Sequence, residues 1–240
     1  MPYIKEVCVA GRTIEISKYF TYKFHKSETG RQKKEEPTSE AVKRINNRNA
    51  IKKLRRILNT NFGDGDYLVR LDFNKTPVSG SEEMQSLTAK ALRKIKSAYK
   101  KSGLECKYVY VKEIGPRGSR HLHMVINKAA VEILSKNWTY GYIHVDILNS
   151  EGQYARIAEY FIKYANKTEV TEGKLIGKRW YGSRNLKKPR ISKKIIQAKD
   201  FLREAKALKG YYIDKDSIVS GISELTGFEY FSYTLIKPPE

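Results

Sequence analysis

The stretch "KYVYVKEIGPRGSRHLHMVIN" (107–127) predicts a β-hairpin near the centre of the chain. Its two apolar runs, 107–114 and 121–127, are rich in Val, Tyr and Ile, and a glycine-containing turn joins them. Alternate residues of a strand point to the same face of its sheet. His121 and His123 therefore share one face, and two of the 4 histidines of the chain lie on one strand.

The hydrophobic patterns of the segments before and after the hairpin predict further elements, which together with the hairpin give the order β-α-β-β-α-β. A capping box from Ser79 to Glu82 is predicted at the start of the first helix. The segments around the hairpin are a strand at 67–73, a helix at 79–103, a helix at 128–137 and a strand at 141–148. This order predicts an α+β, ferredoxin-like core with an antiparallel sheet and helices on one face.

The remaining segments frame this core. Residues 1–65 read as short strands, a charged loop and an amphipathic helix that begins at Thr38 and is basic on its polar side. Because that helix has few acidic residues, its basic side is predicted to contact DNA. The predicted core is 66–205, and 206–240 is predicted to be a C-terminal extension that packs on it.

The charge of the chain points to a polyanionic partner. Lys and Arg total 47 against 26 Asp and Glu, which gives a net charge of +21 over 240 residues. Such an excess is typical of nucleic-acid binding, because each cation on a phosphate releases counterions. No apolar run has the length of a signal peptide or a membrane span, so a soluble, cytoplasmic protein is expected.

The two histidines form a candidate metal site. Their Cα atoms lie roughly 7 Å apart along the strand, and Glu113 ends the neighbouring strand of the hairpin. Two imidazoles and a carboxylate can hold a divalent metal with open positions for a substrate oxygen. The alternative is a pair of solvent-facing histidines. His144 and His25 have no such neighbours and are expected to be structural or surface residues.

A second candidate group lies on the helix predicted at 151–167. Tyr160 and Tyr164, four residues apart, sit at the edge of its apolar face, and Lys163 and Lys167 lie beside them. A phenol has a pKa of about 10, and neighbouring cations favour its phenolate and attract a phosphodiester. The alternative is that both tyrosines simply pack at the margin of an amphipathic helix.

The two motifs together resemble those of a known superfamily. "HLH" (121–123) followed by "YFIKYANK" (160–167) resembles the HUH endonucleases, and among these the rolling-circle replication initiators of small bacterial plasmids and phages. The resemblance extends over roughly 40–200, and the segments 46–73 and 183–189 also look similar to plasmid replication proteins. The 113–167 block carries the specific part.

This resemblance implies a reaction. Mg²⁺ or Mn²⁺, held by His121, His123 and Glu113, would polarise the scissile phosphate of single-stranded DNA. Tyr164 is expected to be the principal nucleophile, which leaves a 5′-phosphotyrosyl enzyme and a free 3′-OH. Tyr160 would be the second nucleophile or a support. The lysines at 163 and 167 would orient the phosphate or the phenolate.

Partners and DNA contacts follow from the same reading. The chain has no Walker-type motif, so host helicase and polymerase are expected partners, besides single-stranded DNA with an origin hairpin. Basic residues interleaved with rings suit a bound single strand. The predicted DNA contacts are Lys52, Arg55, Arg56, Arg117, Arg120, Arg179, Trp180, Arg184, Lys187 and Lys188.

Two other interpretations remain open at this point. One is a relaxase or transposase of the same superfamily. The other is a non-catalytic nucleic-acid-binding protein that uses a ferredoxin-like sheet and basic extensions.

Overall fold

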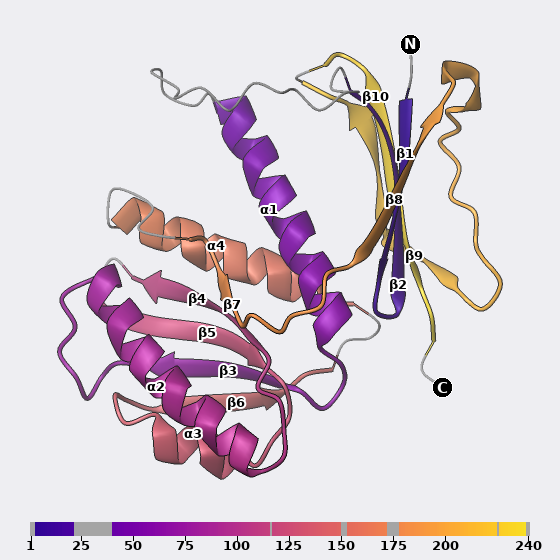
Figure 1. Cartoon of the computed structure of the whole chain (residues 1–240). Helices are drawn as coiled ribbons and strands as arrows, with labels where there is room; N and C mark the ends of the chain where they lie inside the picture. The colour runs from indigo at the N-terminus through magenta and orange to yellow at the C-terminus, as the bar shows by residue number, and fades with distance from the viewer. Residues whose placement is uncertain are drawn as a thin grey trace, which may run out of the picture. The chain divides into compact units, whose positions relative to one another are not determined.

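The computed structural model describes residues 3–21, 40–115, 117–149, 153–171, 178–224 and 226–238. The start of the helix predicted at Thr38, and His25, lie outside these ranges. The chain divides into two compact units, residues 61–187 and residues 1–60 with 188–240. Each contains a five-stranded sheet (Figure 1). In the described part of the chain, no helix has the length and apolar character needed to cross a membrane.

The 61–187 unit contains the predicted hairpin. Its sheet has the order β6-β3-β5-β4-β7, and every neighbouring pair is antiparallel. The β-α-β-β-α-β order and the α+β, ferredoxin-like class are therefore confirmed. The strands are β3 (Tyr67–Asp72), β4 (Tyr108–Ile114), β5 (Arg120–Ile126), β6 (Ile143–Ile147) and β7 (Tyr181–Gly182).

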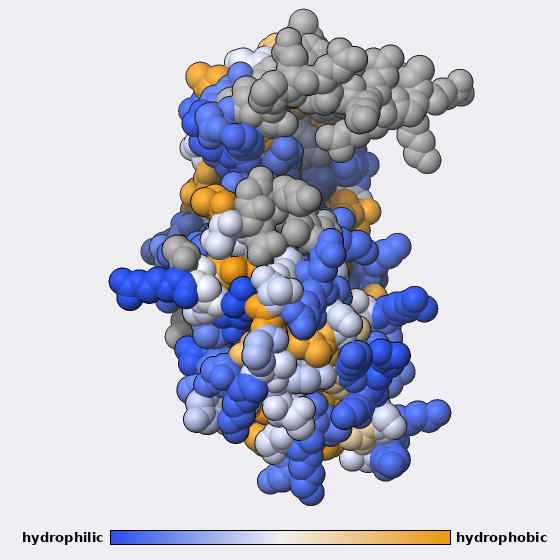
Figure 2. All heavy atoms as spheres, turned by 90° about the vertical axis from the view of Figure 1, so that its left-hand side faces the viewer, coloured by the Kyte–Doolittle hydropathy of each residue, from blue (hydrophilic) through white to orange (hydrophobic). Residues whose placement is uncertain are grey.

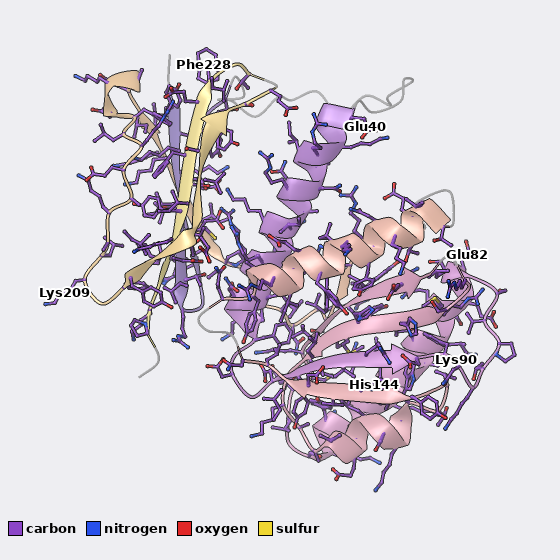
Figure 3. The ribbon with its side chains drawn as sticks, turned by 180° about the vertical axis from the view of Figure 1, so that it is seen from behind. Glu40, Glu82, Lys90, His144, Lys209 and Phe228 are labelled. Atoms are coloured by element: carbon purple, nitrogen blue, oxygen red, sulfur yellow. The ribbon has the colours of Figure 1, made fainter. Side chains whose placement is uncertain are left out.

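Helices cover both faces of this sheet. On one face, α2 (Ser81–Lys101) and α3 (Val131–Asn137) bury an apolar core, to which β5 contributes Leu122 and Met124. The alternation of strand side chains places His121 and His123 on the opposite face. That face is the one contacted by α4 (Ala155–Thr171), which Figure 3 shows in front of the sheet.

The start of α2 differs from the prediction. The helix begins at Ser81 after Gly80, which makes no side-chain cap. Ser79 instead bonds to Glu83 Oε2 through its backbone nitrogen at 2.7 Å and its hydroxyl at 2.9 Å. The predicted box from Ser79 to Glu82 is therefore wrong by one residue, because the helix starts two residues after Ser79.

The second unit combines both ends of the chain in one sheet, of order β8-β1-β2-β10-β9. Strand β8 pairs with β1, so residues after 188 join the N-terminal strands, whereas the sequence predicted a core boundary at 205. The reason is a pairing between strands almost 200 residues apart. The elements are β1 (Tyr3–Ala10), β2 (Thr13–Phe20), α1 (Glu40–Asn61), β8 (Arg190–Ile196), a 3-10 turn (Ala198–Asp200), β9 (Tyr212–Ile222) and β10 (Glu229–Ile236).

The basic side of α1 lies against carboxylates of this sheet. Arg56 contacts Glu6 at 2.7 Å and Glu15 at 2.5 Å, and Lys52 contacts Glu15 at 3.0 Å. Arg55 also pairs with Glu15. Lys52, Arg55 and Arg56, which were predicted to contact DNA, are thus paired with carboxylates of the fold, and their contact with DNA stays a prediction. Their acidic partners come from β1 and β2, not from the helix itself.

These pairs lower the pKa of both glutamates to about 2. Burial alone would raise each pKa, but bonded and neighbouring cations outweigh it, chiefly Arg56 and Lys52 for Glu6, and Arg55 and Lys52 for Glu15. Lys193 of β8 adds a contact to Glu6 at 3.1 Å. Six side chains form this charged cluster beneath α1, which we call the arginine cluster: Glu6, Glu15, Lys52, Arg55, Arg56 and Lys193.

The 61–187 unit is tied together at its two ends. The Asn61 side-chain amide donates to the Lys187 carbonyl at 2.8 Å, and the Lys187 backbone N–H donates to Asn61 Oδ1 at 2.7 Å. One asparagine therefore holds the first and the last residue of the unit side by side.

Candidate active site

The central strand β5 brings the predicted metal ligands together. His121 lies opposite Glu113 of β4 on one side and opposite Asp72 of β3 on the other. Residues directly opposite in an antiparallel sheet point to the same face. Both carboxylates therefore lie on the face that carries His121 and His123.

The first half of the site joins His123, Glu113 and Lys167. Glu113 Oε2 lies 2.7 Å from His123 Nε2, and Glu113 Oε1 lies 2.6 Å from Lys167 Nζ. Burial alone would raise the pKa of Glu113, but its bonds to Lys167 and His123 lower it overall. Burial lowers the pKa of His123. Both pKa shifts favour a neutral imidazole beside an ionised carboxylate.

The second half of the site joins His121 to Asp72. His121 Nδ1 lies 2.8 Å from Asp72 Oδ1, and Arg70 Nε donates to the same oxygen at 3.1 Å. His144 Nε2 lies 3.8 Å from Asp72 Oδ2, so His144 does have an acidic neighbour, while its exposed side chain agrees with the predicted surface position. Figure 3 labels His144 on β6, where its side chain is exposed.

Asp72 was not identified from the sequence, although the structure holds it firmly. Its backbone N–H donates to Tyr142 O at 2.9 Å, and its carbonyl accepts from Trp138 Nε1 at 3.0 Å. A Cβ at Gly141 would lie 2.0 Å from the Asp72 carbonyl oxygen, so only glycine fits there. The available signal was a carboxylate at the end of a strand that is otherwise mostly apolar.

The tyrosines of α4 lie directly against His123. The ring of Tyr164 stacks on the imidazole at 4.2 Å between centroids and 16° between planes, while Tyr160 meets it edge-on at 5.2 Å and 86°. The two phenol rings contact each other at 4.3 Å. Lys167 Nζ lies 5.7 Å from the Tyr164 centroid, whereas Lys163 is exposed to solvent.

Packing and hydrogen bonds fix α4 in this position. Phe161 and Ile162 are buried on its inner side. The Thr168 hydroxyl accepts from the Ile114 backbone N–H at 2.9 Å and donates to the Lys112 carbonyl at 2.9 Å. Because Thr168 is one turn from Tyr164, this bond to β4 sets the height of the tyrosines above the sheet.

The two phenols differ in their surroundings. Burial first, and then its hydrogen bond and proximity to Tyr164, raise the pKa of Tyr160 to about 12. Tyr160 therefore keeps its proton at neutral pH. We call the group of Asp72, Glu113, His121, His123, Tyr160, Tyr164 and Lys167 the histidine cluster.

Every member of the histidine cluster lies on the segment from β3 to α4. Residues 66–169 match the family model Replication-associated protein ORF2/G2P. This match contains the whole cluster and supports a role of the chain in replication. Comparison with curated proteins and with solved structures finds no match.

The donors of the ORF2/G2P-like segment suit a divalent cation in part. Two ligand atoms at right angles on a metal, with bonds of about 2.1 Å, are separated by about 3 Å, and His123 Nε2 and Glu113 Oε2 are separated by 2.7 Å. His121 uses Nδ1 on Asp72, an outer carboxylate contact typical of metal-binding histidines. Within the described residues, however, no three His, Cys, Asp or Glu side chains are gathered as a ligand set.

The predicted DNA contacts of this unit differ in exposure. Arg117, Arg184 and Lys187 are exposed, while Arg179 and Trp180 are half-buried. Lys188, at the start of the second unit, is also exposed. Arg120 instead donates to the carbonyls of Gly118 at 2.8 Å and Ser79 at 3.2 Å. Its guanidinium therefore braces the hairpin turn.

Proposed function

We propose that the 61–187 unit nicks and rejoins single-stranded DNA through a tyrosine, and so initiates rolling-circle replication of a plasmid or phage. The observation that carries this proposal is the stacking of Tyr164 on His123, whose imidazole is bonded to Glu113. A phenol, an imidazole and a carboxylate thus meet on one face of the sheet. The match to a replication-associated family supports the same role.

The chemistry is a transesterification. Tyr164 Oη attacks the scissile phosphorus, the bond from phosphorus to the 3′-oxygen breaks, and the phenol loses its proton while the 3′-oxygen gains one. The products are a 5′-phosphotyrosyl enzyme and a free 3′-OH. The phosphodiester energy is kept in the new ester, so the reverse attack by a 3′-OH rejoins the strand without ATP.

The other members of the cluster have distinct roles. His121, His123 and Glu113 would hold Mg²⁺ or Mn²⁺, which supplies Lewis-acid polarisation of a phosphate oxygen. Lys167 lies between Glu113 and the Tyr164 ring, where its charge stabilises negative charge on the phenolate or the phosphate. Asp72 fixes the orientation of His121.

Tyr164 is the principal nucleophile in this proposal and Tyr160 the second. Tyr160 lies edge-on to His123, and its pKa of about 12 disfavours phenolate. Once the first tyrosine carries the DNA, Tyr160 is the nearest remaining phenol for the next cut. Single-stranded DNA with an origin hairpin is the proposed substrate, and host helicase and polymerase the proposed partners.

A covalent-adduct assay tests this proposal. The full chain is mixed with 3′-labelled single-stranded DNA from candidate origins, with Mn²⁺ or with EDTA, and run on a denaturing protein gel. We expect a metal-dependent shifted band that disappears in Tyr164→Phe and in His121→Ala. Lys163→Gln, at an exposed lysine of the same helix, should have a smaller effect than either. A band that survives in Tyr164→Phe and disappears in Tyr160→Phe would reverse the two roles.

If no covalent adduct formed with any DNA, the proposal that the chain nicks DNA would be wrong. If binding of DNA or RNA nevertheless stayed tight and sensitive to salt, the chain would be a non-catalytic nucleic-acid-binding protein. Survival of the band in EDTA would remove only the metal from the mechanism.

A further inference from the structure

Helix α2 carries a row of cations on its outer side. Its inner side packs into the apolar core through residues such as Met84, Ile95 and Tyr99. From Met84 to Lys101 the helix contains no Asp or Glu. The exposed cations of this stretch are Lys90, Arg93, Lys94, Lys96, Lys100 and Lys101.

Five of these cations share one stripe. At about 100° per residue, Lys90, Arg93, Lys94, Lys100 and Lys101 fall within a sector of about 120°. Lys96 lies outside this sector, with its Nζ 5.1 Å from the Tyr108 ring centroid. The small residues Ser86 and Ser97 lie within the sector and are also exposed. We call this row the α2 stripe.

Within the described residues, no acidic side chain is ion-paired with the α2 stripe, and the acidic residues of α2 itself, Glu82 and Glu83, lie in its first turn before Lys90. None of the ion pairs found there includes one of its five cations. The pairs Lys90–Arg93 and Lys90–Lys94 are three and four residues apart, a spacing at which like charges destabilise a helix. A polyanion bound along the stripe would remove this repulsion.

The last turn of α2 has an additional explanation. Lys100 and Lys101 also interact favourably with the carboxyl end of the helix dipole. That explanation does not extend to Lys90, Arg93 and Lys94, which lie in the middle of the helix. The helix dipole therefore does not explain these three cations, and a bound anionic ligand would. Figure 3 labels Lys90, and Figure 2 shows a face on which hydrophilic residues predominate.

We propose that the α2 stripe binds the phosphate backbone of duplex DNA next to the nick site. The stripe runs roughly 16 Å from Lys90 to Lys101, a length over which a duplex presents about ten phosphates. It contains no aromatic side chain on which unpaired bases could stack. Cations with small hydroxyl residues suit backbone contacts, which carry no base specificity.

The stripe and the histidine cluster lie on opposite faces of one sheet, because α2 packs on the face of Leu122 and α4 on the face of His123. The scissile single strand and the flanking duplex are therefore held by different faces of the unit. The inference rests on the proposed function only for the choice of DNA as the polyanion.

The test is the salt dependence of duplex binding. The variant is Lys90→Gln/Arg93→Gln/Lys94→Gln in the full chain, and the probe is a fluorescent duplex of roughly 30 base pairs, long enough to span the stripe. The slope of log K against log salt should fall in magnitude by about one for each of the three residues that contacts a phosphate. Nicking of a short single-stranded oligonucleotide should stay unchanged.

A matched control removes the same net charge elsewhere. Lys194→Gln/Lys209→Gln/Lys215→Gln changes three exposed lysines of the other unit and should keep the parent slope. An equal fall in both variants would mean that only total charge matters, and would overturn the proposal. An unchanged slope in the α2 variant would overturn it as well.

Two further outcomes separate this inference from the proposed function. If duplex RNA lost as much affinity as duplex DNA and bound as tightly to the parent, the stripe would not be a DNA surface. If the parent protein failed to nick but its duplex binding depended on the stripe, the proposed function would fail, and the α2 stripe would stand as a surface that binds duplex DNA.

Discussion

Each sheet carries two carboxylates on the face covered by a helix, but the two pairs meet different partners. In the arginine cluster, Glu6 and Glu15 contact Arg56 and three further cations, all of which are guanidinium or ammonium groups. In the histidine cluster, Glu113 and Asp72 contact the imidazoles of His121 and His123 and, at 3.8 Å, that of His144, besides Lys167 and Arg70.

The type of partner decides whether a carboxylate only stabilises the fold or can also take part in a reaction. Guanidinium and ammonium groups stay charged at any physiological pH and cannot bind a cation, so the arginine cluster is a closed set of ion pairs. An imidazole near its pKa can hold a proton, lose it or bind a metal. The same carboxylate on a strand thus stabilises the fold in one sheet and is available for reaction in the other.

The largest expected effect is on catalysis. His123→Ala removes the imidazole that contacts both Glu113 and Tyr164, and should lower the rate of nicking by about 1,000-fold, since Lewis-acid polarisation supplies several kcal/mol. The rate of adduct formation with single-stranded DNA measures it. The thermal midpoint should fall less than in the arginine-cluster variants below. A loss of folding equal to that of the arginine-cluster variants below would erase the contrast between the clusters.

Acid should weaken the arginine cluster. The pKa of Glu6 and of Glu15 is lowered from 4.5 to about 2 in the folded chain. Their contribution to stability is therefore complete above pH 4.5 and is lost as the pH falls from 4.5 towards 2. Thermal melting followed by circular dichroism between pH 6 and roughly pH 2.5, the window set by these shifts, should show the decline. A melting temperature that is flat through this range would contradict it.

Substitution of one carboxylate should give a smaller loss of stability. Glu15→Gln leaves Arg55 and Arg56 without their shared anion and should cost about 3 kcal/mol of unfolding free energy, measured by urea denaturation. Nicking at a temperature where the variant is folded should persist. Exposed Glu224→Gln, which breaks only a surface pair with Arg44, is the matched control and should cost far less.

The smallest of the four effects is expected for Asp72→Asn. The amide keeps the size of the side chain but accepts more weakly from His121, and changes in such outer contacts typically cost about 10- to 100-fold in metal affinity or activity. The concentration of Mn²⁺ that gives half-maximal nicking measures it. An unchanged Mn²⁺ requirement would show that Asp72 supports the strand rather than His121.

Local patterns predicted most of the 61–187 unit. The alternation in 107–127 is sufficient to place His121 and His123 on one face, and the spacing of Tyr160 and Tyr164 is sufficient to stack them on one side of a helix. The roles of these residues stay predictions. What alternation could not show is the strand register, and Asp72 is recognisable only once β3 is paired with β5.

Non-local contacts account for the other differences. The partners of Arg55 and Arg56 lie 40 to 50 residues away on β2 and β1, so the helix alone looked like a free basic surface. Helix α2 is also basic, but within the described residues its cations are not paired with carboxylates of a sheet as those of α1 are. In α2 the inner side is apolar and the cations remain outside, whereas in α1 the inner side is itself basic and finds an acidic sheet.

The two hydrogen bonds between Asn61 and Lys187 affect the order in which the two units can fold during synthesis. The segment they close is continuous, so it can fold as soon as it has left the ribosome, while the sheet built from both chain ends must wait for β10. Pairing β8 with β1 closes a loop of more than about 150 residues, and closing so long a flexible loop is entropically costly. Once residues 61–187 have folded with their two ends side by side, most of that loop is no longer flexible. One amide side chain thus shortens the search by which β8 finds β1.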